Sequence, residues 1–388
     1  METFPSEPVK ASAWKLSDFD ALLQWSHGVG ASDIILMPET YAYHRIHGGW
    51  VPATQRPVTN TDICEYLPSV TKLPAAESML SHGSDIDASY DVIVSREARV
   101  RFRVNATACQ TMRGRGVTII FRSIPTIPPT TQELGLEPSL MEGIVHPAGL
   151  VLIAGTMGSG KTTLLSSVIR HIRENQPHRY VVTYEFPIEF NLTDIPGALG
   201  PIAQTEIPRH LESFEIAPVN ATRRAIDVML IGESRDLPTF RGVCEAAEIG
   251  TAAYTTVHTQ SVAETVRRII NKFPLNEHSY MLTSLIGNLR MIVYQTLVPK
   301  VGGGRVAIRE WLAISKTFRR ELMAAQMADL DEMFHQEIYA SGQPLIPYAT
   351  KLHERGIIDS DVLLAVKKRH AFGDVNSLGG NDVAQLKS

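Results

Sequence analysis

The chain has 388 residues, of which 44% are hydrophobic and 20% are charged, and its formal net charge is −4. This length predicts two or three globular domains. The slightly acidic balance provides no global basic field of the kind that attracts nucleic acid, so no direct nucleic-acid partner is predicted.

Cysteine usage and hydropathy indicate the cellular compartment in which the protein works. Cys64, Cys109 and Cys244 are widely spaced and form no metal-ligand pair, which suits a reducing compartment. The sequence contains no apolar run long enough to span a membrane, and its first ten residues lack the core of a signal peptide. We therefore predict a cytoplasmic protein whose membrane association is peripheral.

The N-terminal third is predicted to form an α+β domain over residues 16–122. Residues 1–15 mix Pro, Ser, Glu and Lys and are expected to be a mobile lead-in. Apolar residues recur at helical spacing from Leu16 to His27, and Gly28 and Gly30 should end that helix. The remaining pattern predicts a second helix from residue 62 and a mostly antiparallel sheet with strands at 33–37, 41–47, 91–94, 100–106 and 117–121.

A proline-rich stretch over residues 123–138 is predicted to be a linker. Four prolines lie in it: Pro125, Pro128, Pro129 and Pro138. Proline at this density, with threonines between, is typical of a domain boundary. Such a linker would let two lobes move relative to each other.

Beyond the linker the pattern changes to strands that alternate with helices, which predicts an α/β domain with a parallel sheet over residues 139–310. Its strands are expected at 150–154, 180–185, 228–231 and 252–257. Residues 311–372 read as a helical, polar region. Residues 373–388 are rich in Gly and Asn and are expected to be a disordered tail.

A phosphate-binding loop follows the first of these strands. The apolar run 150–154 is followed by Gly155, Thr156, Met157, Gly158, Ser159, Gly160, Lys161, Thr162 and Thr163. Glycines let backbone N–H groups close around a polyphosphate, and the next helix points its positive end at it. Lys161 should reach the β- and γ-phosphates and Thr162 should hold Mg²⁺, so ATP and Mg²⁺ are the predicted cofactors.

Three polar side chains end later buried strands, where the ligands of open α/β sheets gather. Glu185 would orient the attacking water or accept its proton. Glu233 follows a Walker B-like strand and would hold Mg²⁺, and His258 would sense the γ-phosphate. Each also fits an ordinary alternative: a surface carboxylate, a charged turn and a structural histidine, respectively.

The order of these motifs resembles the PilT/GspE-like superfamily of secretion and pilus-motor ATPases. The resemblance rests on the phosphate loop, Glu185 to Phe190, Gly232 to Asp236 and Thr256 to Thr259, with further matches at 30–34, 101–105 and 121–125. It runs from about Leu22 to about Leu364. The stretches 206–211, 232–236, 254–259 and 262–265 look closest to the DotB/TraJ branch of type IVB secretion and conjugation systems. Retraction motors typically have Met where Ser234 stands.

The resemblance implies a homohexameric ring with a PAS-like N-terminal domain and a RecA-like P-loop ATPase domain, and ATP between the two. It matches Glu185 to the catalytic glutamate, Glu233 to the Walker B glutamate and His258 to the histidine box. Arg103 and Arg122 match arginine fingers better than Arg113 and Arg115 do. The resemblance also implies docking on inner-membrane secretion or conjugation machinery, with another ATPase of the system as one route.

Two alternatives stay open at this point. One is a type IV pilus retraction motor. The other is a nucleotide-gated assembly platform with little turnover, because Phe186 stands where Asp is usual in the family and Thr251 stands where a second histidine is usual. A third departure is Val219, which replaces a common arginine, with Arg223 and Arg224 nearby.

Overall fold

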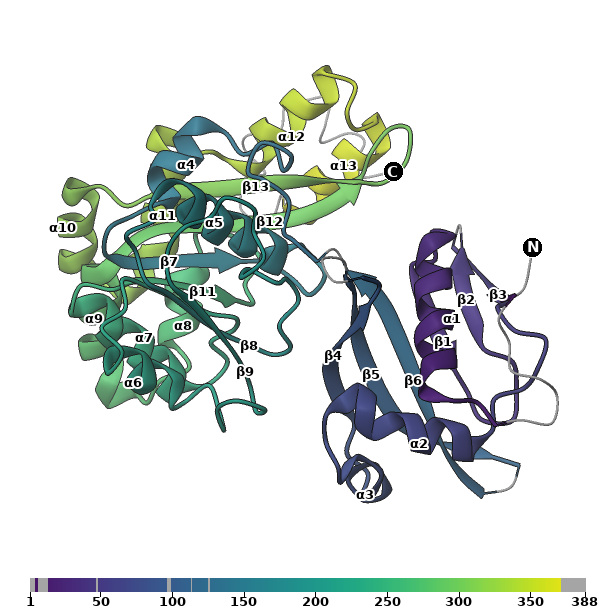
Figure 1. The fold of residues 1–388 in the computed structure, drawn as a ribbon. Helices are drawn as coiled ribbons and strands as arrows, with labels where there is room; N and C mark the ends of the chain where they lie inside the picture. The colour runs from purple at the N-terminus through teal and green to yellow at the C-terminus, as the bar shows by residue number, and fades with distance from the viewer. Residues whose placement is uncertain are drawn as a thin grey trace. The chain divides into compact units, whose positions relative to one another are not determined.

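The structure, a computed structural model, describes residues 4–5, 13–46, 48–95, 99–112, 114–124 and 126–370 (Figure 1). The chain forms two compact units. The N-terminal unit comprises residues 1–128 together with 185–195 and 206–208, and the C-terminal unit comprises the rest. A short segment that follows a strand of the second unit in sequence therefore belongs to the first unit.

The N-terminal unit is built on a six-stranded antiparallel sheet with the order β3-β2-β1-β6-β5-β4. Helices α1, α2 and α3 pack against it, and an aromatic cluster that includes Phe19, Tyr66 and Phe121 fills the core. Strand β4 alternates buried and half-buried residues, as expected for a sheet with one face on a core. The elements are α1 (Leu16–Gly28), β1 (Asp33–Leu36), β2 (Tyr43–Ile46), β3 (Gly49–Pro52), α2 (Asn60–Thr71), α3 (Ala76–Ser81), β4 (Ile86–Ile93), β5 (Arg99–Thr111) and β6 (Gly114–Ile124).

Two residues of the predicted mobile lead-in are instead part of this core. Phe4 and Trp14 are both buried, the Trp14 ring stacks on Phe19, and its backbone N–H donates to Asp62 at 3.1 Å. Local composition could not reveal the contact with Asp62, because that residue lies 48 positions further along the chain. Residues 1–3 and 6–12 of the lead-in lie outside the described residues.

The C-terminal unit contains a seven-stranded sheet with the order β13-β12-β7-β11-β10-β8-β9. Strands β12, β7, β11, β10 and β8 run parallel to one another, and β13 is antiparallel to β12. Strands β7, β8, β10 and β11 are buried along their whole length, which is typical of a parallel sheet covered on both faces. The strands are β7 (Gly149–Ala154), β8 (Val181–Glu185), β9 (Ile202–Glu206), β10 (Val228–Ile231), β11 (Ala252–Val257), β12 (Leu289–Pro299) and β13 (Arg305–Ala313).

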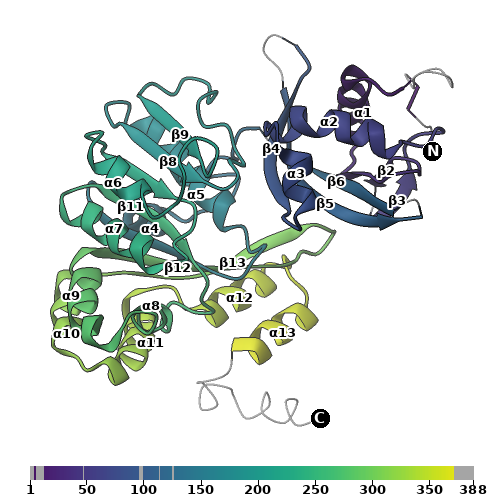
Figure 2. The same ribbon diagram turned by 90° about the horizontal axis from the view of Figure 1, so that it is seen from below.

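Helices surround this sheet, and α12 packs on β13 at its edge (Figure 2). The helices are α4 (Pro138–Ile144), α5 (Lys161–Asn175), α6 (Ala217–Thr222), α7 (Leu237–Glu248), α8 (Thr265–Ile270), η1 (Leu275–Glu277), α9 (His278–Asn288), α10 (Lys316–Ala324), η2 (Met327–Asp329), α11 (Leu330–Ser341), α12 (Leu345–Glu354) and α13 (Ser360–His370). Among the described residues, no helix combines the length and apolarity that crossing a membrane requires.

The structure differs from the sequence prediction at several boundaries. Residues 311–313, predicted to begin the helical region, are the end of β13, because Trp311 pairs with Val293 across the β12–β13 hairpin. Strand β6 runs to Ile124, two residues beyond the predicted domain end, and α4 already begins at Pro138. The predicted tail at 373–388 lies outside the described residues.

Candidate functional site

The predicted phosphate loop lies between β7 and α5, at the carboxyl end of a buried parallel strand. Gly155, Gly158 and Gly160 have φ angles of +149°, +74° and +82°. A Cβ atom on Gly155 would lie 2.5 Å from both the Gln295 carbonyl oxygen and Ser159 Oγ. The loop therefore needs glycine at these positions for backbone conformation and, at Gly155, for space as well.

Lys161 closes the loop on itself. Its side chain is nearly buried, and Nζ donates to the carbonyl oxygens of Gly155 at 2.7 Å and Thr156 at 2.9 Å. Burial lowers the pKa of Lys161, and the negative charge of Glu233 opposes that shift. The ammonium group is thus held at the loop backbone, where a polyphosphate would exchange these carbonyls for phosphate oxygens.

The rest of the loop leads from an exposed tip into α5. Met157 is 85% exposed, and Gly158 follows it in the left-handed conformation. Thr162 and Thr163 lie half-buried in the first turn of α5. The Thr162 hydroxyl therefore lies in the first turn of a helix whose N-terminal N–H groups favour an anion.

Two buried polar residues brace the loop from the neighbouring hairpin, and sequence reasoning missed both. Gln295 on β12 donates from Nε2 to the Ser159 carbonyl oxygen at 2.8 Å. Arg309 on β13 donates from Nε to Gln295 Oε1 at 2.8 Å and from Nη2 to the Leu134 carbonyl oxygen at 3.1 Å. The only signal in the sequence was a glutamine inside an apolar strand.

A second cluster forms around Glu233, just beyond β10. Its carboxylate contacts Arg235 Nη2 at 2.7 Å and His258 Nε2 at 2.6 Å. Burial by itself would raise the pKa of Glu233, but Arg235 and His258 more than offset this, and the pKa is lowered. The structure thus brings Glu233 and His258 together and adds Arg235 to the cluster. The sequence motif at 232–236 contains Arg235 but does not indicate this contact.

Mg²⁺ fits the oxygen donors of this unit. The ion usually takes one or two protein oxygens together with phosphate and water, so no dedicated cage is needed. The hydroxyl of Thr162 and the ionised carboxylate of Glu233 are donors of that kind. The described part of the chain contains no cluster of three or more His, Cys, Asp or Glu side chains that could hold a metal by itself.

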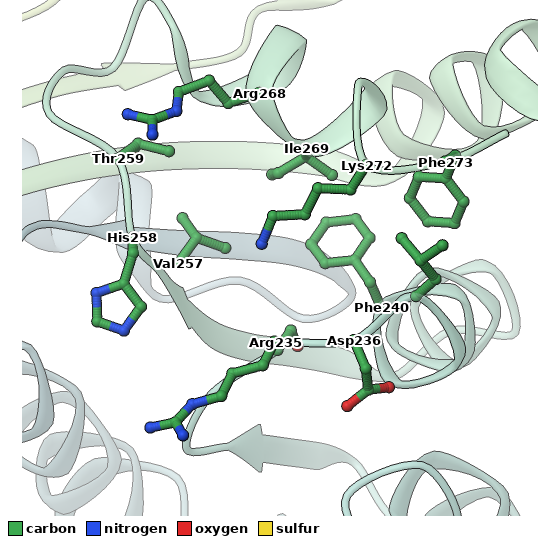
Figure 3. A pocket seen from close by; sticks show the side chains of 12 residues that line it. Arg235, Asp236, Phe240, Val257, His258, Thr259, Arg268, Ile269, Lys272 and Phe273 are labelled. Carbon is green, nitrogen blue, oxygen red and sulfur yellow. The ribbon is translucent and has the colours of Figure 1, made fainter. Parts of the chain in front are cut away.

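A pocket of about 50 Å³ opens beside this cluster (Figure 3). Arg235 and His258 lie at one side, the rings of Phe240 and Phe273 lie at the other, and Lys272 extends between them. Ser234 lines the pocket and is buried, and its Oγ lies 2.8 Å from Thr255 Oγ1. A small hydroxyl at position 234 therefore has a partner that a longer apolar side chain would lose.

The remaining predicted site residues belong to the N-terminal unit. Arg103 pairs with Glu189 at 3.3 Å and with Asp87 at 3.8 Å, and Arg122 pairs with Asp33 at 2.8 Å. The side chains of Arg103 and Arg122 are 42% and 64% exposed, so part of each remains accessible.

Glu185, a predicted site residue, and Arg115, a weaker match to an arginine finger, have different surroundings. Glu185 is buried at the end of β8. Arg115 donates to the carbonyl oxygens of Leu80 and Ser81, so it ties the β5–β6 hairpin to the end of α3. Arg113 lies outside the described residues.

Comparison with known proteins gives concordant matches. Residues 18–328 match the family described as "Type II/IV secretion system protein". The crystal structure of the ATPase DotB from Legionella pneumophila is 33% identical and superposes with a TM-score of 0.88, covering 95% of this chain and 99% of that one. The pilus retraction motor PilT with bound ADP has a TM-score of 0.78 at 28% identity, covering 89% of this chain and 96% of that one.

Sequence comparison also finds the pilus retraction ATPase PilT of Pseudomonas aeruginosa. The two proteins are 37% identical over 230 residues, which is 58% of this chain and 64% of that protein. The alignment thus spans slightly less than two thirds of this relative.

Proposed function

The chain belongs to the type II/IV secretion protein family, whose members are ATP-hydrolysing enzymes, and we propose that this P-loop ATPase powers a type IVB secretion or conjugative transfer machine. One observation carries the ATPase part of the proposal. A loop lysine held at the phosphate-binding backbone lies in the same unit as a strand-end carboxylate, Glu233, that contacts Arg235 and His258 and whose pKa is lowered. Phosphoryl transfer needs little else from a protein than positioning and charge stabilisation.

The proposed roles follow from the contacts. Lys161 and the N–H groups of residues 155–163 bind the β- and γ-phosphates. Thr162 and Glu233 hold Mg²⁺, which supplies positive charge next to the transferring phosphoryl group when bound. His258 contacts Glu233 directly, so it responds to any change in what that carboxylate holds.

Water activation is assigned to the segment that follows β8. Glu185 is the residue that the resemblance indicates, but it is only 4% exposed. Glu189 lies four residues later with 23% of its side chain exposed, and it pairs with Arg103. Glu189 is therefore a second candidate, and Glu185→Gln and Glu189→Gln, measured separately, identify which carboxylate the reaction needs.

We propose further that the working form is a homohexamer with a PAS-like N-terminal domain, and that Arg103 and Arg122 act in it as arginine fingers. The partial exposure of both side chains supports this, because the planar fork of arginine neutralises phosphate oxygens in pairs. The chain would dock peripherally at the cytoplasmic face of the inner membrane, on the secretion or conjugation machinery.

The choice of machine rests on the extent of the likeness. DotB superposes on 95% of this chain with a TM-score of 0.88 at 33% identity, whereas PilT superposes on 89% with a TM-score of 0.78 at 28% identity. The sequence identity to the PilT of Pseudomonas aeruginosa is higher, at 37%, but spans 58% of this chain. Pilus retraction is therefore the second candidate. Expressing the chain in strains that lack either kind of motor separates the two: restored secretion or transfer supports the proposal, and restored twitching motility alone overturns it.

A nucleotide-gated platform with little turnover is tested in the same strains. It predicts that replacement of both carboxylates, Glu185→Gln with Glu189→Gln, leaves secretion or transfer intact, whereas Lys161→Ala abolishes it. Equal loss in the two variants rejects the platform.

Hydrolysis itself is tested by phosphate release from the purified full chain. Lys161→Ala should lower the rate about 100-fold or more, because one preorganised charge on the phosphoryl group is removed. An unchanged rate in this variant would rule out the loop as the hydrolytic site.

A further inference from the structure

The segment that carries Glu185 and Glu189 is anchored by an arginine on a distant strand. Arg101 on β5 is buried, and it donates from Nε at 3.3 Å and from Nη2 at 2.9 Å to the carbonyl oxygen of Ile188. Its Nη1 pairs with Asp91 at 3.3 Å, and Nη2 also donates to Ser89 Oγ at 3.2 Å. All three guanidinium nitrogens are therefore engaged, and they fix one peptide of the segment.

Glu206 holds the same residue from its other side. Its Oε2 accepts the Ile188 N–H at 3.1 Å and the Ser89 hydroxyl at 3.0 Å. Both backbone polar groups of Ile188 are thus bound by buried charged side chains that meet at Ser89. Glu206 is the first residue of the stretch 206–211, one of those in which the sequence looks closest to the DotB/TraJ branch.

Two backbone contacts complete the anchorage. The Ile207 N–H donates to the Glu185 carbonyl oxygen at 2.8 Å, and the Asn191 N–H donates to the Thr126 carbonyl oxygen at 2.7 Å. The segment is therefore held at residues 185, 188 and 191. Both candidate carboxylates lie on this short, pinned stretch, which belongs to the N-terminal unit.

From these contacts we propose that Arg101 and Glu206 are a positioning pair that sets where the water-activating carboxylate stands. The inference rests on the proposed function, and it assigns control of the hydrolytic group to β4 and β5. Arginine suits the task because its rigid fork serves several acceptors at once, which a lysine cannot do. A shift of about 1 Å in a reacting group can cost on the order of 100-fold in rate.

The test begins with Arg101→Lys in the full chain. We expect kcat for ATP to fall about tenfold or more, with KM and the affinity for a fluorescent ATP analogue changed less than about twofold. The matched control is Arg99→Lys, an exposed arginine two residues away on the same strand, which should behave as the wild type. Equal kcat in Arg101→Lys and the wild type overturns the proposal.

Glu206 supplies a second arm that does not depend on how the lysine variant folds. Glu206→Gln keeps an acceptor oxygen for the Ile188 N–H and should retain most activity, whereas Glu206→Ala should lose kcat as Arg101→Lys does. Full activity in Glu206→Ala would contradict the proposal that Glu206 and Arg101 position the water-activating carboxylate.

Coupling between variants separates positioning from general damage. In a Glu185→Gln/Glu189→Gln background, Arg101→Lys should lower the residual rate by less than about twofold, since the group it positions is gone. A full additional loss there means that Arg101 acts elsewhere and overturns the inference. Absence of turnover in the wild type would instead reject the proposed function, so the two failures are distinguishable.

Discussion

The phosphate loop and the acidic segment at 185–195 are held in place by different kinds of contact. The loop continues directly from a buried strand into a helix, and its braces, Gln295 and Arg309, come from strands of the same sheet. The acidic segment begins at Glu185, the last residue of β8, and is fixed by side chains of the N-terminal unit, above all Arg101. The phosphate loop is therefore held by contacts within its own unit, whereas Glu185 and Glu189, the carboxylates that we propose activate water, lie on a segment held by side chains of the N-terminal unit.

The largest effect is expected at Glu233, which belongs to the same unit as the phosphate loop but should affect turnover rather than nucleotide binding. Glu233→Gln keeps a hydrogen-bond acceptor for Arg235 but removes the charge. We expect kcat to fall about 100-fold or more while the ATP analogue still binds. Phosphate release and analogue fluorescence measure the two effects. A loss of binding as large as the loss of kcat would contradict the assignment.

The brace of the loop is tested by Gln295→Ala. The variant leaves the buried Arg309 Nε without its partner, so the free energy of unfolding should fall by about 1–3 kcal/mol. Nucleotide affinity should fall as well, because Ser159 loses its donor. Chemical denaturation checks the first effect, with the exposed Gln336→Ala as control. Stability equal to that of the control would show that the brace is not needed.

The Glu233 cluster gives a prediction in pH. Burial raises the pKa of Glu233, and Arg235 and His258 lower it below its ordinary value. Arg235→Ala removes one lowering partner, so a smaller fraction of Glu233 is ionised at a given acidic pH. The acid limb of the kcat/KM profile should therefore move to higher pH. Arg268→Ala, which lines the same pocket and pairs with Glu264 instead, should leave the limb in place. A shift of the acid limb to lower pH would contradict the effect assigned to Arg235 on the pKa of Glu233.

The smallest expected effect concerns Ser234. Ser234→Ala loses the contact with Thr255, so stability should fall by about 1 kcal/mol with little change in kcat. Denaturant titration with a parallel ATPase assay checks both. A large loss of kcat would place Ser234 in the hydrolytic machinery rather than beside it.

The sequence predicts contiguous elements better than contacts between distant residues. The strand, loop and helix around Lys161 could be predicted because each is formed by consecutive residues. The sequence placed Glu233 and His258 each at the end of a buried strand, but their contact depends on β10 and β11 being neighbours in the sheet, which the structure shows. The contact of Arg101 with Ile188 joins residues that are 87 positions apart, and no local pattern announces it. The buried Gln295 and Trp14 were missed for the same reason, since their partners lie elsewhere in the chain.

The most direct measurement compares nucleotide binding and turnover in two variants of the full chain. Lys161→Ala changes the loop, and Glu185→Gln/Glu189→Gln changes the acidic segment. We predict that the first variant loses affinity for the ATP analogue. The second should bind it as the wild type does but release phosphate about 100-fold more slowly. Wild-type turnover in the second variant, or an equal loss of binding in both, would contradict the division between the two regions.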